Sequence, residues 1–169
     1  IATDGLTLYY DPTFLLRQGR EQTMKQIMHI MLHGLLGHFL IKDDYEQKSI
    51  RDLMMDFQAD YLLSRIGGVV SAIKSFKGNR LDTLVQGDYS MSCYYRLLTK
   101  NEVHSQLTYY QYHLQVDNHS MWDEDMSERH KRKVQELWGD IQQVVLGEET
   151  EDRDGLAFVA ETIMGTKKG

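Results

Sequence analysis

The sequence predicts an α+β domain that is mostly helical and carries a small β-sheet. Apolar residues recur at helical spacing over three long stretches, and a short stretch near the start alternates with a period of two. The 169 residues are enough to bury one hydrophobic core, and the single cysteine excludes an internal disulfide framework. We therefore expect one domain over residues 1–164, with a linker at residues 165–169 that leads to a further C-terminal domain.

Charge and hydropathy exclude two classes of protein. The formal net charge is −6, and the basic residues form no cluster apart from residues 129–133, which excludes a nucleic-acid binder that relies on phosphate contacts. The longest stretch without a charged residue, residues 26–41, is too short and too polar to span a membrane. We expect no signal peptide before it, and a soluble, cytoplasmic domain.

The first predicted element is a short strand near the start of the chain. Apolar Leu6, Leu8 and Tyr10 alternate with the residues between them, which is typical of a strand with one buried face. Pro12 ends this strand, because proline has no N–H to donate to a sheet.

Two long helices follow. The first covers residues 21–39 and is apolar around nearly its whole circumference, which is typical of a buried helix; Gly37 is expected to end it. The second begins at Ser49, a good N-cap, and ends before Gly67. It carries two apolar stripes, formed by Ile50, Leu53, Met54, Phe57 and Tyr61 and by Met55, Ala59, Leu62 and Ile66.

The second half of the chain contains further elements. We expect a short helix over residues 69–76, a helix over residues 89–98 and a strand over residues 107–116. Ser127 is the N-cap of the clearest amphipathic helix, whose first turn carries the basic residues 129–133 as a solvated face. Its apolar face consists of Val134, Leu137, Trp138, Ile141, Val144 and Val145.

The first long helix carries the residues best suited to chemistry. His29 and His33 are four residues apart, so a helix directs both imidazoles from one face toward a single ion. His38 follows a glycine that can turn the chain and bring a third imidazole back. Three neutral imidazoles and one carboxylate suit tetrahedral zinc, and another divalent metal is the alternative. The sequence therefore predicts a metal site on this helix.

The second long helix supplies the carboxylate. Asp60 borders its apolar stripe, where an acidic group is costly to bury unless it has a partner or a metal ion. Asp56, one turn earlier, is the competing candidate. The alternative to a metal site is that the histidines are ordinary core residues, in which case the protein is a metal-free helical protein-interaction domain. The spacing of the three histidines together with a buried acid favours the metal.

The order of these motifs resembles a known family. A strand motif covers residues 2–12, one helix reads His29-x-x-x-His33-x-x-x-Leu36-Gly37-His38, and the next contains Ala59-Asp60-Tyr61. This order resembles the metallopeptidase domain of zincin-like fold that precedes a von Willebrand factor A-like domain in bacterial proteins. The resemblance implies a zincin-like helix pair with a small β-sheet. It assigns the metal ligands to His29, His33, His38 and Asp60.

The same resemblance implies partners and a downstream element. It implies a von Willebrand factor A-like domain on the C-terminal side in the full-length chain, and a protein or peptide as the ligand. Residues 117–122, which read Asp117-Asn118-His119-Ser120-Met121-Trp122, are similar to an element that follows in that family.

The chain departs from the family at Ile30. The family's helix reads H-E-x-x-H-x-x-x-G-H, and its glutamate takes a proton from the metal-bound water. Isoleucine cannot do this, and a general base contributes roughly 10²–10⁴-fold to the rate. We therefore expect a pseudo-peptidase or an interaction module that has kept the metal.

The alternative is an active zinc-dependent hydrolase or peptidase with a relocated base. Asp117 and His119 are the main candidates for that base, beside Asp56 and Glu124. His119 lies in an acidic, polar stretch where Trp122 can pack beneath it. It is a candidate for a fourth metal ligand or a general base, and the favoured interpretation is an ordinary loop histidine.

Overall fold

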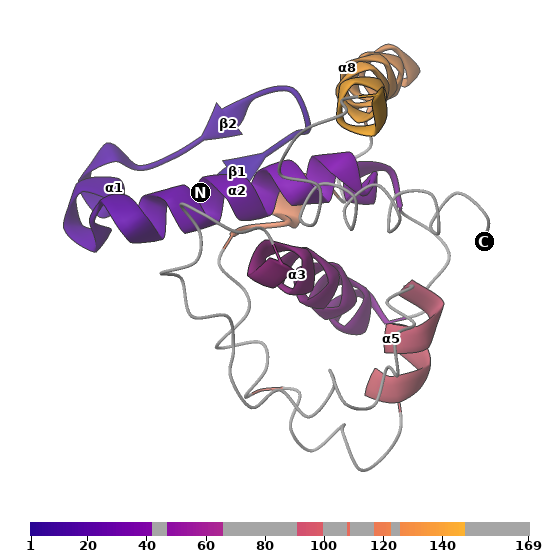
Figure 1. Cartoon of the computed structure of the whole chain (residues 1–169), viewed down its shortest axis with the longest axis horizontal. Helices are drawn as coiled ribbons and strands as arrows, with labels where there is room; N and C mark the ends of the chain where they lie inside the picture. Colours follow the sequence, from indigo (N-terminus) through magenta and orange to yellow (C-terminus); the bar gives the residue numbers. More distant parts are fainter. Residues whose placement is uncertain (42–46, 66–90, 100–107, 109–116, 123–125, 148–169) are drawn as a thin grey trace.

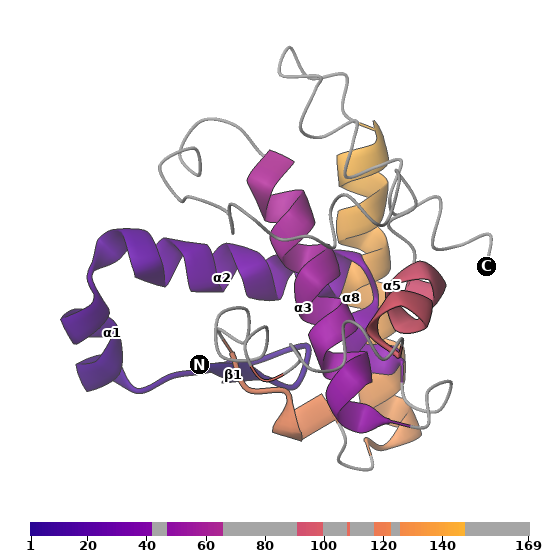
Figure 2. The same ribbon diagram turned by 90° about the horizontal axis from the view of Figure 1, so that it is seen from below.

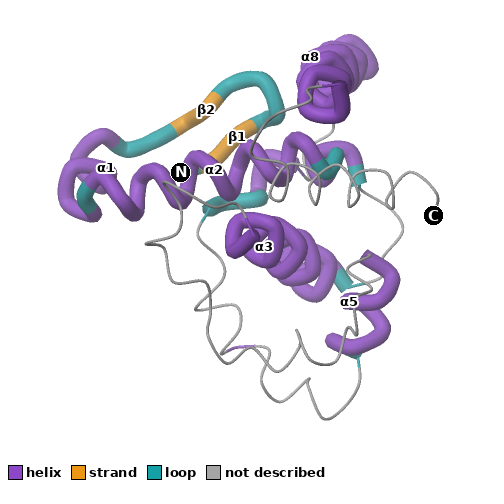
Figure 3. Tube along the Cα trace, in the orientation of Figure 1, coloured by secondary structure: helices purple, strands orange, loops and turns teal. Residues whose placement is uncertain are grey.

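The computed structural model describes residues 1–41, 47–65, 91–99, 108, 117–122 and 126–147 (Figure 1). These residues confirm a mostly helical chain with a small antiparallel sheet (Figure 3). The elements are β1 (Ala2–Thr3), β2 (Leu8–Tyr9), α1 (Pro12–Gln18), α2 (Arg20–Leu35), the 3-10 helix η1 (His38–Leu40), α3 (Lys48–Arg65), α5 (Met91–Leu98), the 3-10 helix η3 (Ser120–Trp122) and α8 (Glu128–Gly147).

The small sheet connects the start of the chain to a segment more than a hundred residues later. β1 pairs with β2 in antiparallel register, with Thr3 opposite Leu8, so part of the predicted strand over residues 6–10 is present. On its other side Ala2 forms a parallel bridge with Asn118, whose backbone N–H donates to the carbonyl of Ile1 at 2.9 Å. The bridge holds residues 117–122 beside the N-terminus.

The chain between β2 and α2 forms a helix that the sequence interpretation missed. The Asp11 carboxylate accepts hydrogen bonds from the backbone N–H groups of Thr13 and Phe14, and Pro12 occupies the first turn. An acidic N-cap followed by proline is a helix-start signal. Pro12 therefore begins α1 as well as ending the strand.

Helix α2 is shorter than the predicted helix over residues 21–39. It ends at Leu35, and Gly37 then adopts the left-handed conformation with φ +74°. That conformation is readily available only to glycine, and it turns the chain into η1. His38 therefore lies on a separate element and not on the continuation of α2.

Helix α2 lies between α3 and α8 (Figure 1), and α3 crosses it in the orthogonal view (Figure 2). One apolar cluster joins α2 to α3, and a second extends from α2 through α3 to α5. The first cluster consists of Leu32, Leu35, Leu36, Ala59, Leu62 and Leu63. The second includes Ile30, Phe39, Ile50, Leu53, Met54, Phe57, Cys93, Leu98 and Trp122.

Several boundary predictions are corrected. α3 begins at Lys48, so Ser49 lies inside the helix instead of capping it. α5 lies within the predicted helix over residues 89–98. Ser127 is confirmed as a cap of α8, because its hydroxyl accepts from the backbone N–H of His130 at 3.2 Å.

The apolar face predicted for α8 is only partly buried. Val134 is buried, and Trp138, Ile141 and Val145 are partly buried. Leu137 and Val144 remain 41% and 58% exposed, because the packing side of α8 is narrower than its apolar stripe.

Other predictions fall outside the described residues. These are the short helix over residues 69–76, the strand over residues 107–116 apart from Thr108, which is helical, and the linker at residues 165–169. None of the helices in the described part of the chain combines the length and the apolar character needed to cross a membrane.

Candidate metal centre

Helix α2 presents two imidazoles to one point. His29 and His33 lie one turn apart, and their Nε2 atoms are 2.8 Å from each other. Both side chains are fully buried on the side of α2 that faces α3. The i, i+4 spacing therefore produces the geometry that the sequence predicts.

Asp56 of α3 is at the centre of the group. Its Oδ1 atom lies 3.1 Å from His29 Nε2 and 3.4 Å from His33 Nε2. The same oxygen lies 3.2 Å from the Nε2 atom of His119. One carboxylate oxygen thus faces three imidazole nitrogens.

The segment beside β1 contributes Asp117 and His119. The Asp117 Oδ1 atom lies 3.7 Å from His29 Nε2 and 3.0 Å from His119 Nε2. The His119 ring is stacked on Trp122, with centroids 3.8 Å apart and planes 16° apart, and the Trp122 indole donates to the carbonyl of Thr3 at 2.9 Å. The interpretation of His119 as an ordinary loop histidine is wrong, since the ring is buried and held in place.

The donor atoms have a spacing that suits a metal ion. His29, His33, Asp56 and Asp117 each offer one ligand atom, all four atoms lie within 4.8 Å of one another, and the group could hold a metal ion. A tetrahedral zinc with ordinary bond lengths separates its ligand atoms by roughly 3.3–3.6 Å. The separations between His29 and the other three donor atoms, 2.8–3.7 Å, lie around that range, and no pair of the four atoms is more than 4.8 Å apart. Imidazole nitrogen and carboxylate oxygen are both good zinc ligands.

The electrostatics of the group require a positive charge at its centre. Burial alone would raise the pKa of Asp56, but the charge of His119 and hydrogen bonds from His119 and His29 hold it well below its usual range. Burial also opposes ionisation of Asp117, whose pKa is nevertheless lowered, chiefly by its hydrogen bond with His119. Two buried carboxylates are thus ionised side by side. Such a pair is stable only with a cation between the two groups.

The pKa values of His33 and His119 are shifted in opposite directions. Burial, followed by repulsion from His29, lowers the pKa of His33 to about 4, which keeps this ring neutral. Burial would also lower the pKa of His119, but the charge of Asp56 and the hydrogen bond with Asp117 outweigh it and raise the pKa to about 10. A proton on His119 therefore supplies the cation in the absence of metal, and a divalent ion would replace it.

Three polar atoms support the fit to a metal. His29 Nδ1, His119 Nδ1 and Asp117 Oδ2 are buried and have no hydrogen-bond partner among the described residues. Each belongs to a side chain whose other polar atom faces the centre. An unpaired buried polar atom costs about 1–3 kcal/mol, and an interaction with an ion at the opposite atom of each side chain would offset that cost.

The structure separates two of the predicted ligands from this group. The Nδ1 atom of His38 lies 2.8 Å from His33 Nδ1, and its Nε2 atom lies 2.8 Å from Gln58 Oε1. His38 therefore contacts the ring nitrogen of His33 that faces away from the other donor atoms. Asp60 lies 3.8 Å from the ammonium group of Lys25 and does not join the four donors. Asp56, the competing candidate, occupies the place expected for Asp60.

Residue 30, where the resemblance would place a catalytic glutamate, offers no carboxylate. Ile30 is buried in the apolar cluster with Phe39 and Leu53. Of the other acids and bases considered from the sequence, Asp117 and His119 are in the centre itself, and Glu124 lies outside the described residues.

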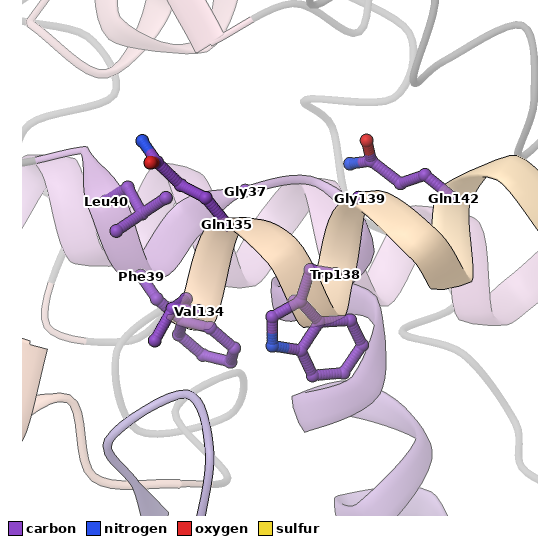
Figure 4. Close-up of a pocket in the computed structure, with 9 residues that line it drawn as sticks. Gly37, Phe39, Leu40, Val134, Gln135, Trp138, Gly139 and Gln142 are labelled. Atoms are coloured by element: carbon purple, nitrogen blue, oxygen red, sulfur yellow. The ribbon is translucent and has the colours of Figure 1, made fainter. Parts of the chain in front are cut away.

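The side of α2 that faces α8 carries a separate pocket. It lies between α2, η1 and α8, and Val134 and Trp138 of α8 point into it beside Phe39 (Figure 4). No histidine or carboxylate of the described chain lines this pocket. It is therefore distinct from the metal centre.

Comparisons with protein-family models, with curated proteins and with solved structures found no match for this chain. The interpretation of the site consequently depends on its own geometry and chemistry.

Proposed function

We propose that this domain binds one divalent metal ion, zinc in the first place, and that the ion has a structural role. The observation that carries the proposal is the convergence of four donor atoms within 4.8 Å from α2, α3 and the segment at residue 117. An ion there would be bound by His29, His33, Asp56 and Asp117, with His119 adjacent. It would neutralise the carboxylates and join three separate parts of the chain.

The burial of the centre supports a structural role over a catalytic one. The donor side chains are 0–2% exposed. Structural zinc sites are closed by protein ligands, whereas catalytic ones keep a position open for water or substrate. Ile30 also removes the usual proton acceptor. The proposed class is therefore a pseudo-peptidase or interaction module of the zincin-like kind, with a protein or peptide, or a following von Willebrand factor A-like domain, as its partner.

One observation favours a second candidate, an active metal-dependent hydrolase with a relocated base. The Asp117 Oδ2 and His119 Nδ1 atoms have no hydrogen-bond partner in the described part of the chain. Either group could accept a proton beside the ion. This candidate requires the centre to open to substrate, because both side chains are buried.

Metal content is the first test. We expect one zinc per chain by plasma mass spectrometry in tag-free protein, and none in the variant His29→Ala/His33→Ala, because that variant loses both imidazoles of α2. Absence of metal from the wild type, with no uptake of added zinc, would overturn the proposal and favour the metal-free interaction domain.

Hydrolysis is the second test. We expect the zinc-loaded protein to leave a broad peptide library intact. Cleavage that is lost on chelation and restored by zinc would instead establish the hydrolase.

A further inference from the structure

Three buried polar side chains form a line that leads away from the candidate metal centre. His33 contributes its Nε2 atom to the centre, while its Nδ1 atom lies 2.8 Å from Nδ1 of His38. The Nε2 atom of His38 lies 2.8 Å from Oε1 of Gln58. All three side chains are fully buried, so water does not compete for these contacts.

Metal binding by the Nε2 atom of His33 determines which nitrogen of each ring along this line carries a proton. An imidazole binds a metal ion through a bare nitrogen, so Nε2 of His33 must carry no proton. The remaining proton of a neutral ring is then on Nδ1, which makes His33 the donor to His38. Nδ1 of His38 must accept this bond, and the proton of His38 is therefore on Nε2. That N–H requires an acceptor, and the Oε1 atom of Gln58 is one.

We propose that Gln58 and His38 are positioning residues that hold His33 in the tautomer that binds the metal. Gln58 accepts the N–H of His38, and His38 in turn accepts the N–H of His33. The inference rests on the proposed metal site, and it gives His38 a role other than that of a ligand. Partners of this kind fix the orientation of a ligating histidine and raise its basicity.

The opposite tautomer shows why the acceptor matters. Without an acceptor at residue 58, the proton of His38 gains a hydrogen bond by moving to Nδ1, where it points at His33. His33 then accepts at Nδ1 and carries its own proton on Nε2, directed into the centre. A metal ion could bind only after this proton is moved, which weakens its affinity.

Two features of the fold bring His33, His38 and Gln58 together. Gln58 is two residues after Asp56 on α3, so one helix supplies both a donor to the ion and the end of the line. Gly37, in its left-handed conformation, turns the chain so that His38 comes back beside His33. The line therefore depends on the same α2–α3 packing as the centre itself.

Zinc affinity is compared in three variants: one removes the acceptor oxygen at residue 58, one restores it, and one is a matched control at another buried glutamine. Gln58→Met keeps the approximate size of the side chain but removes the strong acceptor, and we expect it to weaken zinc binding about 10–100-fold in a competition with a chromophoric chelator. Gln58→Glu restores an acceptor oxygen and should recover most of the affinity. Gln26→Met makes the same change at a buried glutamine of α2 that accepts from Gln18 at 2.7 Å, and it should leave the affinity unchanged.

Equal affinities for Gln58→Met and Gln26→Met would overturn the proposal. So would a failure of Gln58→Glu to bind more tightly than Gln58→Met when both are folded by circular dichroism.

The tautomers are measured directly in the wild type, which keeps the test valid even when a variant fails to fold. Long-range ¹H–¹⁵N spectra of the histidine rings should show His33 protonated at Nδ1 and His38 protonated at Nε2, both with zinc and without it. A spectrum with His33 protonated at Nε2 in the metal-free protein would contradict the proposal. Failure to take up zinc would overturn the proposed function and with it the metal-binding purpose of this line, whereas the metal-free spectrum tests the line of hydrogen bonds by itself.

Discussion

Helices α2 and α3 are joined in two different ways along their length. In one part, leucines of α2 and apolar residues of α3 form a closed cluster that includes Leu32, Leu36 and Leu62. In the other, His29 and His33 face the carboxylate of Asp56. Both contacts are buried, and both belong to the same pair of helices. They differ in what stabilises them: the apolar contact needs only protein side chains, whereas the polar contact also needs a bound proton or metal ion.

The difference is one of charge. Each buried leucine contributes about 1.5–3 kcal/mol through the removal of apolar surface from water, with no dependence on pH or on an ion. The polar part buries two carboxylates, which is unfavourable unless a proton or a metal ion supplies a positive charge. The apolar part thus holds the helices together under all conditions, whereas the stability of the polar part depends on what is bound.

The largest expected effect on the free energy of unfolding comes from removing the charge of Asp56 in the polar part. Saturating zinc, at about a thousand times its dissociation constant, should raise the free energy of unfolding by about 4 kcal/mol in the wild type. In Asp56→Asn we expect this gain to vanish, because the oxygen shared by three imidazoles loses its charge. Urea denaturation with and without zinc measures both values.

Asp60→Asn is the matched control for this experiment. It makes the same change one turn later on the same helix, at a carboxylate that faces Lys25. It should keep the full zinc gain, because Asp60 is not one of the four donor residues. A variant Asp60→Asn that loses zinc while Asp56→Asn retains it would reverse our assignment of the ligand.

The second prediction concerns the apolar part. Leu62 is fully buried, and Leu62→Ala should lower the free energy of unfolding by about 3 kcal/mol, within the usual range of 2–5 kcal/mol for such a cavity. The loss should be the same with and without zinc, because the cluster contains no ligand. Urea denaturation of the variant in both states tests this, and a loss confined to the zinc-free protein would show that the two parts are coupled.

The third prediction is the pH dependence of the metal-free protein on the acid side. The pKa of His33 is lowered to about 4 from an ordinary value of 6.5, mainly by burial. Its contribution to stability is therefore complete above pH 6.5 and is lost as the pH falls toward 4, on the order of 3 kcal/mol in all. Urea denaturation from pH 4 to pH 7 measures this loss.

On the alkaline side the sign is reversed. The pKa of His119 is raised to about 10, because the carboxylates of Asp56 and Asp117 outweigh the effect of burial. Its contribution is complete below pH 6.5 and is lost as the pH rises toward 10. We expect stability without zinc to be greatest near pH 6.5, and the alkaline loss to be absent from His119→Gln. A flat profile in the wild type would contradict this account of the centre.

The smallest effect is expected on the side of α2 that faces α8. A Cβ atom on Gly34 would overlap the indole ring of Trp138, so Gly34→Ala should push α8 away and cost about 1–3 kcal/mol without changing the zinc content. Gly139→Ala on α8 meets no atom within 4 Å and should be neutral or stabilising by up to about 1 kcal/mol. Thermal unfolding and metal analysis of the two variants make the comparison.

The sequence predicts those features that depend on one element at a time. The i, i+4 spacing of His29 and His33 places both rings on one face of a helix, whatever the helix packs against. Ser127 similarly marks the start of α8, where its hydroxyl caps the first turn. The prediction for α1 failed although the signal was local, because Asp11 and Pro12 were interpreted only as the end of a strand.

The assignment of the carboxylate required the packing of two helices. Asp56 and Asp60 lie on the same helix one turn apart, and both are buried. Which of them meets His29 depends on the position and direction in which α3 crosses α2, and spacing along one helix does not contain that information. Asp56 lies 27 residues from His29 in the sequence.

The sequence by itself thus determined that the protein is mostly helical and that two imidazoles of α2 converge on one point, because the helical repeat fixes which neighbours share a face. The tertiary structure alone decided the rest of the centre. It placed His119 beside Asp56 through a strand bridge between Ala2 and Asn118, and it moved His38 behind His33 through the turn at Gly37. The position of His119 depends on contacts between distant segments, whose register is set by the burial of whole helices and strands, whereas His38 is only five residues from His33 and is placed by a local turn.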